Sequence, residues 1–268
     1  MDRIEDIIGE FRKVSSATPR LFRAPGRVNL IGEHTDYNDG FVMPFALDRD
    51  AITAAAVRGD DTVNARALDK DEIVTFRLSD APQKETHGWR DYVEGIIRIL
   101  GQKFGIDRGV DLVFSSTVPM GGGLSSSAAL LTSVGLAYVK LAGVEYEAEE
   151  LALDAQAAEH EFVGMRSGIM DQFTAVFGKK DHAMLLDCRS REIEQKPLNT
   201  LKGAKILVCD TKVQHELASS EYNQRRAQCE LGVKILRRHL GNIDALRDVT
   251  EEEVEAFRED LPEIVYRR

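Results

Sequence analysis

The chain has 268 residues, a length that suits one large α/β domain or two fused domains. Its 35 lysines and arginines against 45 aspartates and glutamates give a formal net charge of −10, which repels nucleic acid and anionic membranes at long range, so we expect neither as a partner. An anionic ligand therefore has to be held locally, by helix N-termini, backbone N–H groups or a metal.

The N-terminal part is predicted to begin with a helix and to continue as a sheet. Ile4, Ile7, Ile8 and Phe11 share one face at helical spacing, which predicts an amphipathic helix over residues 4–14. This segment has no uninterrupted apolar run and so resembles neither a signal peptide nor a membrane span. Short β-branched or alternating segments then predict strands at residues 21–26, 28–32, 51–58, 62–68 and 72–78, with "GDD" at 59–61 as a hairpin tip.

Helices and strands alternate in the rest of the chain. Apolar residues at helical spacing predict a helix over residues 89–104, ended by Gly105. Further helices are predicted at 126–142, 147–163, 218–239 and 250–258, and strands at 109–119, 182–188, 192–198 and 204–210. This order predicts an α/β fold with a layered mixed sheet. We place a domain change after residue 180, giving domains at 1–180 and 181–268.

The cysteines indicate the redox compartment. Cys188, Cys209 and Cys229 are an odd number and show no CxxC spacing. They suggest neither a disulfide framework nor a zinc site. This cysteine usage fits a reducing, cytoplasmic location.

A glycine- and serine-rich loop, "VPMGGGLSSSAAL", joins a predicted strand to a predicted helix. Glycines without a Cβ let backbone N–H groups approach an oxyanion, and the helix that follows presents its free N–H groups and positive dipole end. The loop therefore has the properties of a phosphate cradle, in which a serine hydroxyl could reach a magnesium ion. The alternative is a tight strand-to-helix turn with a serine N-cap and no ligand. The loop has neither a Walker lysine nor a GxGxxG motif.

Two carboxylates lie in or beside apolar segments. Glu159 falls at the edge of the apolar stripe of the predicted 147–163 helix, where it is either a magnesium ligand or a boundary residue with its head in solvent. Asp171, in "GIMDQF", enters an apolar segment just after Gly168. Asp171 is either a helix cap or the acceptor of a substrate hydroxyl proton, as in phosphoryl transfer to alcohols.

A cluster of polar residues follows a strand-like segment in "GRVNLIGEHTDY". Glu33, His34 and Asp36 offer hydrogen-bond partners to a ligand rich in hydroxyls, such as a sugar. A site of this kind rejects the wrong epimer because buried polar groups are left unpaired. The alternatives are a polar loop with an Asx-type turn at "DYNDG" and, for His34, a structural histidine.

Four motifs together resemble one enzyme family. "GRVNLIGEHTDYNDG" resembles the signature of the galactokinases, and "VPMGGGLSSSAAL" is similar to the ATP-binding motif of the wider group of galactokinase, homoserine, mevalonate and phosphomevalonate (GHMP) kinases. "GIMDQF" and "SSEYNQRRAQCE" also resemble galactokinase segments, in the expected order. The resemblance covers residues 20–235 and implies the two-domain GHMP-kinase fold.

The resemblance also implies an activity and roles for individual residues. It implies ATP-dependent phosphorylation of α-D-galactose at the anomeric hydroxyl, with Mg²⁺, a small-molecule sugar and ATP as the partners. Asp171 would be the catalytic base and Arg27 its charge-stabilising neighbour. The sugar pocket would contain Glu33, His34, Thr35, Asp36, Gly168 and Tyr222. The ATP phosphates would bind Gly121, Gly122, Gly123, Leu124, Ser125, Ser126 and Ser127, and the metal would bind Ser127 and Glu159.

The sequence departs from the family pattern at its C-terminal end. Galactokinases carry another glycine-rich motif near their C-terminus, and nothing like it follows Tyr222. We therefore expect the N-terminal domain and a truncated C-terminal domain, and a monomer for the full-length form. Two other functions stay open: a kinase for a related sugar, N-acetylgalactosamine or L-arabinose, and a non-catalytic sensor that binds galactose and ATP.

Overall fold

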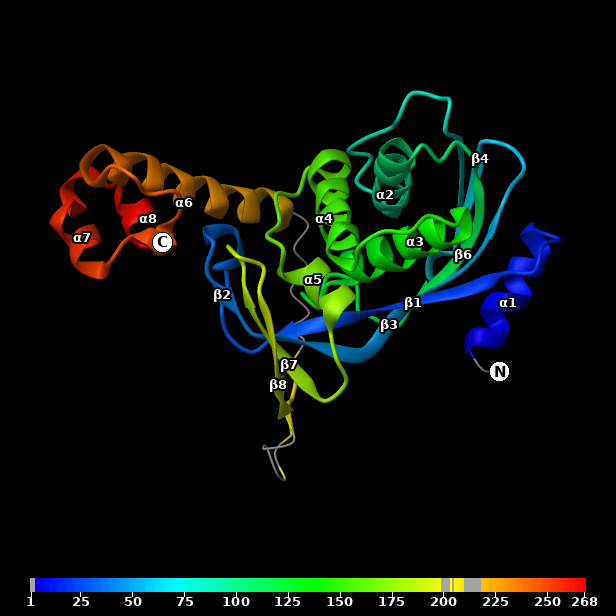
Figure 1. Ribbon diagram of the computed structural model, residues 1–268, viewed down its shortest axis with the longest axis horizontal. Helices are drawn as coiled ribbons and strands as arrows, with labels where there is room; N and C mark the ends of the chain where they lie inside the picture. The colour runs from blue at the N-terminus through cyan, green and yellow to red at the C-terminus, as the bar shows by residue number, and fades with distance from the viewer. Residues whose placement is uncertain (1–2, 199–202, 204, 210–217) are drawn as a thin grey trace.

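The computed structural model describes residues 3–198, 203, 205–209 and 218–268, and in these ranges the strands form two sheets (Figure 1). The larger sheet has the order β1-β3-β6-β4-β5, antiparallel except for the parallel pair β4 and β6. Its strands are β1 Arg20–Asn29, β3 Pro44–Val57, β4 Thr62–Ala67, β5 Glu72–Arg77 and β6 Val110–Ser116. The smaller sheet is antiparallel, in the order β2-β7-β8, and consists of β2 Phe41–Val42, β7 His182–Asp187 and β8 Ile193–Pro197. The prediction of a layered mixed α/β fold is confirmed.

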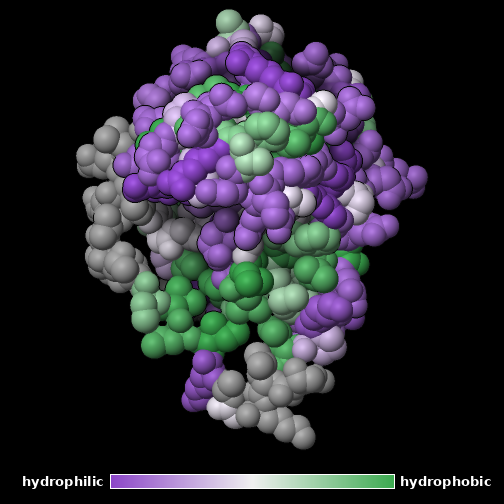
Figure 2. Space-filling view, turned by 90° about the vertical axis from the view of Figure 1, so that its left-hand side faces the viewer, coloured by the Kyte–Doolittle hydropathy of each residue, from purple (hydrophilic) through white to green (hydrophobic). Residues whose placement is uncertain are grey.

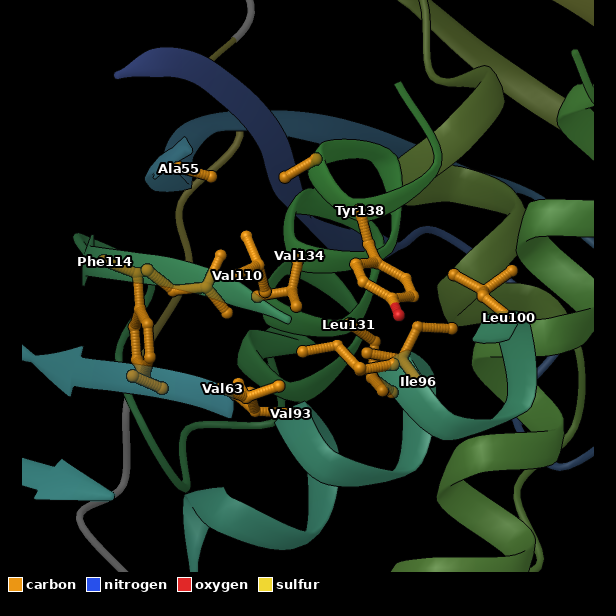
Figure 3. Close-up of a cluster of buried hydrophobic side chains, with 14 of the residues drawn as sticks. Ala55, Val63, Val93, Ile96, Leu100, Val110, Phe114, Leu131, Val134 and Tyr138 are labelled. Atoms are coloured by element: carbon orange, nitrogen blue, oxygen red, sulfur yellow. The ribbon is translucent and has the colours of Figure 1, made fainter. Parts of the chain in front are cut away.

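Helices cover both faces of the larger sheet. On one face, α2 Trp89–Phe104, α3 Ser126–Ala142 and α4 Ala148–Ala158 enclose the main buried cluster, in which Ile96, Leu131 and Val134 meet strand residues (Figure 3). On the other face, α1 Arg3–Val14 packs its Ile7 and Phe11 against β3 and β6. Because both faces are covered, residues 50–56 of β3 and 110–115 of β6 are buried without alternation.

The helix predictions agree closely with the structure. The predicted helices at 89–104 and 126–142 coincide with α2 and α3. The predicted helix at 147–163 is α4 followed by a single π-helical turn, Glu159–Val163, after which comes α5 Met170–Phe177. The remaining helices are α6 Ala218–Leu240, α7 Glu251–Ala256 and α8 Glu263–Tyr266, with short 3-10 turns at Asp36–Asn38, Leu68–Lys70, Leu246–Asp248 and Arg258–Asp260.

Three strand predictions are corrected. The segment 59–61 is not a hairpin tip, because β6 lies between β3 and β4 in the sheet. The strands predicted at 21–26 and 28–32 are one strand, β1, with a register irregularity between Pro25 and Arg27. Of the strand predicted at 204–210, residues 204 and 210 lie outside the described residues. Residues 205–209 pair with no strand in the described part of the chain, so their backbone groups have no sheet partner.

The C-terminal helices have a buried cluster of their own. Val233 and Leu236 of α6 pack against Ile243, Leu261 and Val265. Figure 1 shows α6 extending away from the larger sheet, with α7 and α8 at its far end. Figure 2, which faces these helices, shows a mostly hydrophilic surface over them and hydrophobic residues gathered below. The predicted domain division after residue 180 stays a prediction.

Candidate active site

Three segments that are far apart in the sequence meet at Asp171, in the first turn of α5. Arg27 of β1 donates through Nε to Asp171 Oδ1 at 2.8 Å, and Ser125 Oγ donates to Asp171 Oδ2 at 2.5 Å. Arg27 also donates through a terminal nitrogen to the carbonyl of Gly123 at 2.6 Å. A second guanidinium nitrogen of Arg27 lies 2.6 Å from the same Oδ1, so the cation Arg27 binds one carboxylate oxygen of Asp171 and Ser125 binds the other. We call Arg27, Ser125 and Asp171 the Asp171 cluster.

A glycine in β1 brings Arg27 against the glycine-rich loop. The Arg27 N–H donates to the carbonyl of Leu124 at 3.0 Å. A Cβ on Gly26 would lie only 2.7 Å from that same carbonyl oxygen and 2.8 Å from a methyl group of Val118. Only glycine at this position allows the strand and the loop to approach so closely.

The loop over residues 121–127 has open space on its glycine side. Gly121 and Gly123 have φ values of +72° and +67°, and nothing lies within 4 Å of a Cβ built on either. Ser125 has φ +60° and lies at the N-cap position of α3, yet its side chain makes no cap hydrogen bond. Its hydroxyl binds Asp171 instead, so the alternative of a serine N-cap does not hold at Ser125. The N-terminal N–H groups of α3 keep their capacity to bind an oxyanion.

Glu159 begins the π-helical turn after α4, and it is only 2% exposed. Its Oε2 accepts hydrogen bonds from Ser167 Oγ at 2.5 Å and from Gln172 Nε2 at 2.9 Å. Desolvation by burial raises the pKa of Glu159. The nearby Ser127 hydroxyl acts in the opposite direction, because it favours the ionised carboxylate and so lowers the pKa. The alternative of a boundary glutamate with its head in solvent is wrong, because the carboxylate is buried and hydrogen-bonded.

Asp36, in the loop after β1, lies against Gly168. Asp36 is 9% exposed, and a Cβ on Gly168 would lie 2.0 Å from Asp36 Oδ2. Desolvation by burial, followed by the negative charge of Asp171, raises the pKa of Asp36 to about 6, although backbone N–H groups of Tyr37 and Met170 bind the carboxylate. The buried carboxylate distinguishes Asp36 from a residue of a solvated polar turn.

Aromatic rings gather beside Gly168. The Gly168 N–H donates to the hydroxyl of Tyr222, on α6, at 3.3 Å. The His34 ring centroid lies 5.3 Å from that of Tyr222 and 5.7 Å from that of Tyr37. Burial lowers the pKa of His34, and Arg225 and Arg268 add to this effect. The imidazole is therefore predominantly neutral at pH 7.

The two other residues predicted for the sugar pocket contact their own loop. Thr35 Oγ1 lies 2.8 Å from the carbonyl oxygen of Gly32 and 2.7 Å from that of Phe41. Glu33 is exposed and accepts a hydrogen bond from Asn29 Nδ2 at 3.1 Å. Thr35 thus closes the loop between β1 and β2, and Glu33 lies exposed on the surface of this loop.

A cavity of about 250 Å³ lies on the other side of the glycine-rich loop. Sequence reasoning missed it, because its walls come from the segment after β4, α2, β6 and the start of α3. Met120 is the one local signal, since an exposed methionine directly precedes the glycines. The lining residues are Ala67, Asp69, Lys70, His87, Gly88, Trp89, Tyr92, Phe114, Ser116, Met120, Ser126, Ser127 and Leu130.

The comparisons with known proteins agree on one family. The galactose-binding signature of galactokinases matches residues 9–57, and the N-terminal domain of GHMP kinases matches residues 91–179. A galactokinase of Chloroflexus aurantiacus is 47% identical over 243 residues, which are 91% of this chain and 62% of that protein. A galactokinase of Chloroflexus aggregans is 45% identical over 263 residues, 98% of this chain and 67% of that protein. The chain belongs to the galactokinase family.

Solved structures place this galactokinase-family chain in the same fold. The structure of Lactococcus lactis galactokinase, crystallised with galactose, superimposes with a TM-score of 0.87 at 31% sequence identity. The match includes 98% of this chain and 69% of the Lactococcus lactis chain. Methanococcus jannaschii mevalonate kinase has a TM-score of 0.62 at 16% identity, a likeness of fold alone. The two ranges matched by the family models contain the whole Asp171 cluster, whereas α6 lies outside both.

The described residues meet the requirements neither of a metal cluster nor of a membrane-spanning helix. They contain no group of three or more histidines, cysteines, aspartates or glutamates that could hold a metal by itself. Among the helices described, none is long and apolar enough to cross a bilayer.

Proposed function

We propose that the chain carries the sugar- and ATP-binding part of a galactokinase, which phosphorylates α-D-galactose at its anomeric hydroxyl. The observation that supports this most is the Asp171 cluster. It joins a carboxylate, a cation and a glycine-rich loop at one point, and the buried Asp36 lies close by. The chain spans 62% of the C. aurantiacus galactokinase and 67% of the C. aggregans one, so the activity of the whole protein is part of this proposal.

Asp171 is the proposed base. Its Oδ2 keeps a lone pair beyond the bond from Ser125, so a sugar hydroxyl can donate to it. The proton of the anomeric hydroxyl passes to this carboxylate while the γ-phosphoryl group is transferred in line. Arg27, which is 13% exposed on its side chain, supplies positive charge where negative charge develops.

The loop over residues 121–127 is the proposed site for the ATP phosphates. The space beside Gly121 and Gly123 admits oxyanions close to the backbone, and the N–H groups at the start of α3 can bind them. The cavity beyond the loop has aromatic and apolar walls, including Trp89 and Tyr92, which fit a flat heterocycle such as adenine.

Ser127 and Glu159 fit the proposed role of magnesium ligands. The Ser127 hydroxyl lies near enough to the Glu159 carboxylate to favour its ionised form, so a hydroxyl and a carboxylate oxygen come close together at the start of α3. Mg²⁺ prefers such hard oxygen donors together with substrate phosphates. When bound, the ion would neutralise charge on the phosphates. Ser167 and Gln172 fix the position of the Glu159 carboxylate.

Asp36, Gly168 and Tyr222 are proposed to recognise the sugar, with His34, Thr35 and Glu33 completing the loop around it. A buried carboxylate that accepts a specific sugar hydroxyl is left unpaired when the wrong epimer binds. The Lactococcus lactis relative was crystallised with galactose, which supports this sugar over others.

The experiment combines binding with turnover. The purified chain is titrated with galactose and with ATP by calorimetry, and galactose 1-phosphate is followed by phosphorus NMR in the presence of Mg²⁺. We expect Asp171→Asn to keep galactose affinity within about threefold and to lower kcat by about a thousandfold, because it removes the base but keeps the shape.

The outcomes separate the candidate functions. Galactose 1-phosphate formed by the wild type and lost in Asp171→Asn supports the proposal. Faster turnover of N-acetylgalactosamine or L-arabinose would assign a related sugar. Binding of galactose and ATP without any sugar phosphate would favour the sensor, and an Asp171→Asn variant with wild-type kcat would exclude Asp171 as the base.

A further inference from the structure

Residues 164–168 form an irregular segment that connects the main groups of the proposed site. The Ser167 hydroxyl donates a hydrogen bond to the Glu159 carboxylate, and Gly168 packs against the Asp36 carboxylate. Helix α5, which carries Asp171, begins two residues later. A displacement of this segment would therefore move a partner of Glu159 and the residue packed against Asp36, and it would shift the start of the helix that carries Asp171. The segment belongs to no helix or strand, so its backbone groups need other partners.

The first turns of α6 supply those partners through two side chains. Asn223 Oδ1 accepts the Arg166 N–H at 2.9 Å, and Asn223 Nδ2 donates to the Gly164 carbonyl at 2.9 Å. Arg226, one turn further along, donates to the carbonyls of Arg166 at 2.8 Å and Ser167 at 3.2 Å. One amide and one guanidinium thus bind four backbone groups of the segment. Of these, the Ser167 carbonyl also accepts from Gln156 Nε2 at 3.1 Å and lies 2.8 Å from His160 Nε2.

Other contacts fix the Arg226 side chain over the segment. Glu230, on the next turn of α6, accepts from Arg226 Nε at 3.2 Å and from the Arg166 side chain at 2.5 Å. The Arg226 guanidinium also lies 5.9 Å from the centroid of the Tyr37 ring, in the loop that carries Asp36. Arg226 is therefore held between the two loops of the proposed sugar site.

We propose that Asn223 and Arg226 are positioning residues of the sugar site, which hold residues 164–168 so that Gly168 and Ser167 keep Asp36 and Glu159 in place. Neither residue contacts the Asp171 cluster in the contacts of the described chain. Both act through the backbone of the 164–168 segment. This inference rests on the proposed function for its sugar, whereas the holding of the segment does not depend on any ligand.

The experiment uses the whole chain and the variants Asn223→Ala and Arg226→Ala. Amide hydrogen exchange measures how firmly the segment is held without ligand, and calorimetry measures the Kd for galactose and, separately, for ATP. We expect the Arg166 amide to exchange about tenfold faster in Asn223→Ala, since it loses its acceptor. In both variants we expect the Kd for galactose to rise about tenfold. The Kd for ATP, measured without Mg²⁺ so that Glu159 does not contribute as a metal ligand, should change less than about twofold.

Two further variants control for general destabilisation. Arg238→Ala removes an exposed cation of the same helix for which the described residues show no side-chain partner, and it should leave both constants unchanged. Arg226→Lys keeps the charge and one donor, and it should recover part of the galactose affinity. A merely structural role would weaken galactose and ATP binding together, in proportion to the loss of thermal stability.

The results separate this inference from the proposed function. Wild-type exchange at Arg166 in Asn223→Ala, or unchanged galactose affinity in both variants, would overturn the positioning role. If the wild type binds no galactose, the sugar assignment fails together with its part of this inference. The exchange rates then still decide whether α6 holds the segment.

Discussion

The environment of the Asp36 carboxylate favours its protonated form, whereas its proposed role in sugar binding requires the ionised form. Burial and the nearby charge of Asp171 favour its protonated form and raise its pKa from 3.8 to about 6. A sugar hydroxyl that donates a hydrogen bond to Asp36 needs the ionised form as its acceptor. Asp36 therefore links sugar binding to pH near the lower end of the physiological range.

We expect galactose affinity to fall as the pH drops below the Asp36 pKa of about 6. Well below that pH the fraction of ionised Asp36 falls about tenfold per pH unit, and the affinity falls with it. Calorimetric titrations of the wild type from about pH 5 to about pH 8 measure this dependence. In Asp36→Asn the affinity should be lower and nearly independent of pH. A wild-type affinity that stays constant across the range would refute the assignment of Asp36 as an ionised acceptor.

The same titration has the opposite effect on stability. Because the folded-state pKa lies above the unfolded value of 3.8, the stabilisation from protonated Asp36 is complete below that value and is lost as the pH rises through about 6. The shift of about two units corresponds to about 3 kcal/mol. The free energy of unfolding, measured by urea denaturation, should therefore decrease for the wild type relative to Asp36→Asn as the pH rises from about 4 to about 7.

Gly168 leaves no room for a side chain. A methyl group there would overlap the Asp36 carboxylate, whose Oδ2 would lie 2.0 Å away. We expect Gly168→Ala to destabilise the chain by about 1–3 kcal/mol and to weaken galactose binding without changing the Kd for ATP. Gly9→Ala is the matched control, because nothing lies within 4 Å of its Cβ position in α1, and it should stabilise the chain slightly. Equal galactose affinity in Gly168→Ala and wild type would contradict the tight contact.

At the scale of elements, local signals define the helices and long-range contacts define the sheet. The sequence predicts α2 well, because its apolar periodicity ends at Gly105, which adopts φ +65° as a C-cap. It does not predict that β6 lies between β3 and β4, because this order depends on pairing between residues far apart in the chain. It also does not predict the π-helical turn at Glu159, which no local pattern distinguishes from a continuing α-helix.

The proposed site likewise contains residues that local sequence signals identify and residues that only long-range contacts identify. The motif residues Arg27, Ser125 and Asp171 can be named from sequence because each lies in a distinctive short segment, and the structure brings them together. The contacts of Asn223 with the 164–168 segment cannot be named this way, since they span 57 and 59 residues and involve backbone atoms. The cavity lined by Trp89 and Tyr92 is missed for the same reason.

Helix α1 tests the layered packing independently of the site. Phe11 is fully buried between α1 and the outer face of the larger sheet. We expect Phe11→Ala to lower the free energy of unfolding by about 3–5 kcal/mol, because it removes a ring and leaves a cavity. Arg12→Ala, at the exposed neighbouring position, should change it by less than about 0.5 kcal/mol. Both are measured by urea denaturation. A loss below about 1 kcal/mol in Phe11→Ala would show that α1 is not packed as described.

At the scale of the molecule, an arginine joins the C-terminal helices to the rest. Arg247, in the turn after α6, donates to both oxygens of Asp187, at 2.5 Å and 2.9 Å, and to the carbonyl of Asp39 at 2.8 Å. Its guanidinium also lies 4.3 Å from the centroid of the Phe41 ring. Arg189 adds a second bridge, from Asp39 to Asp248. These contacts connect the C-terminal helices to the loop that carries Asp36.

We expect Arg247→Ala to loosen these helices without unfolding the chain. The bond from Arg247 lowers the pKa of Asp187 to about 2, so the variant should raise this pKa toward its ordinary 3.8. The wild-type advantage in stability is present above the ordinary pKa and is lost as the pH falls toward the lowered one. Because the Arg247–Asp187 pair is partly exposed, this advantage in the free energy of unfolding amounts to about 1 kcal/mol.

Hydrogen exchange of α6 to α8 and NMR titration of the Asp187 carboxyl measure the two effects of Arg247→Ala. The exchange of these helices should become faster, while that of α2 and α3 should not change, because the main core does not contact Arg247. Arg238→Ala, which removes a charge of the same sign from α6, is the control and should change neither quantity. An Asp187 pKa that stays near 2 in Arg247→Ala would show that other groups hold this junction.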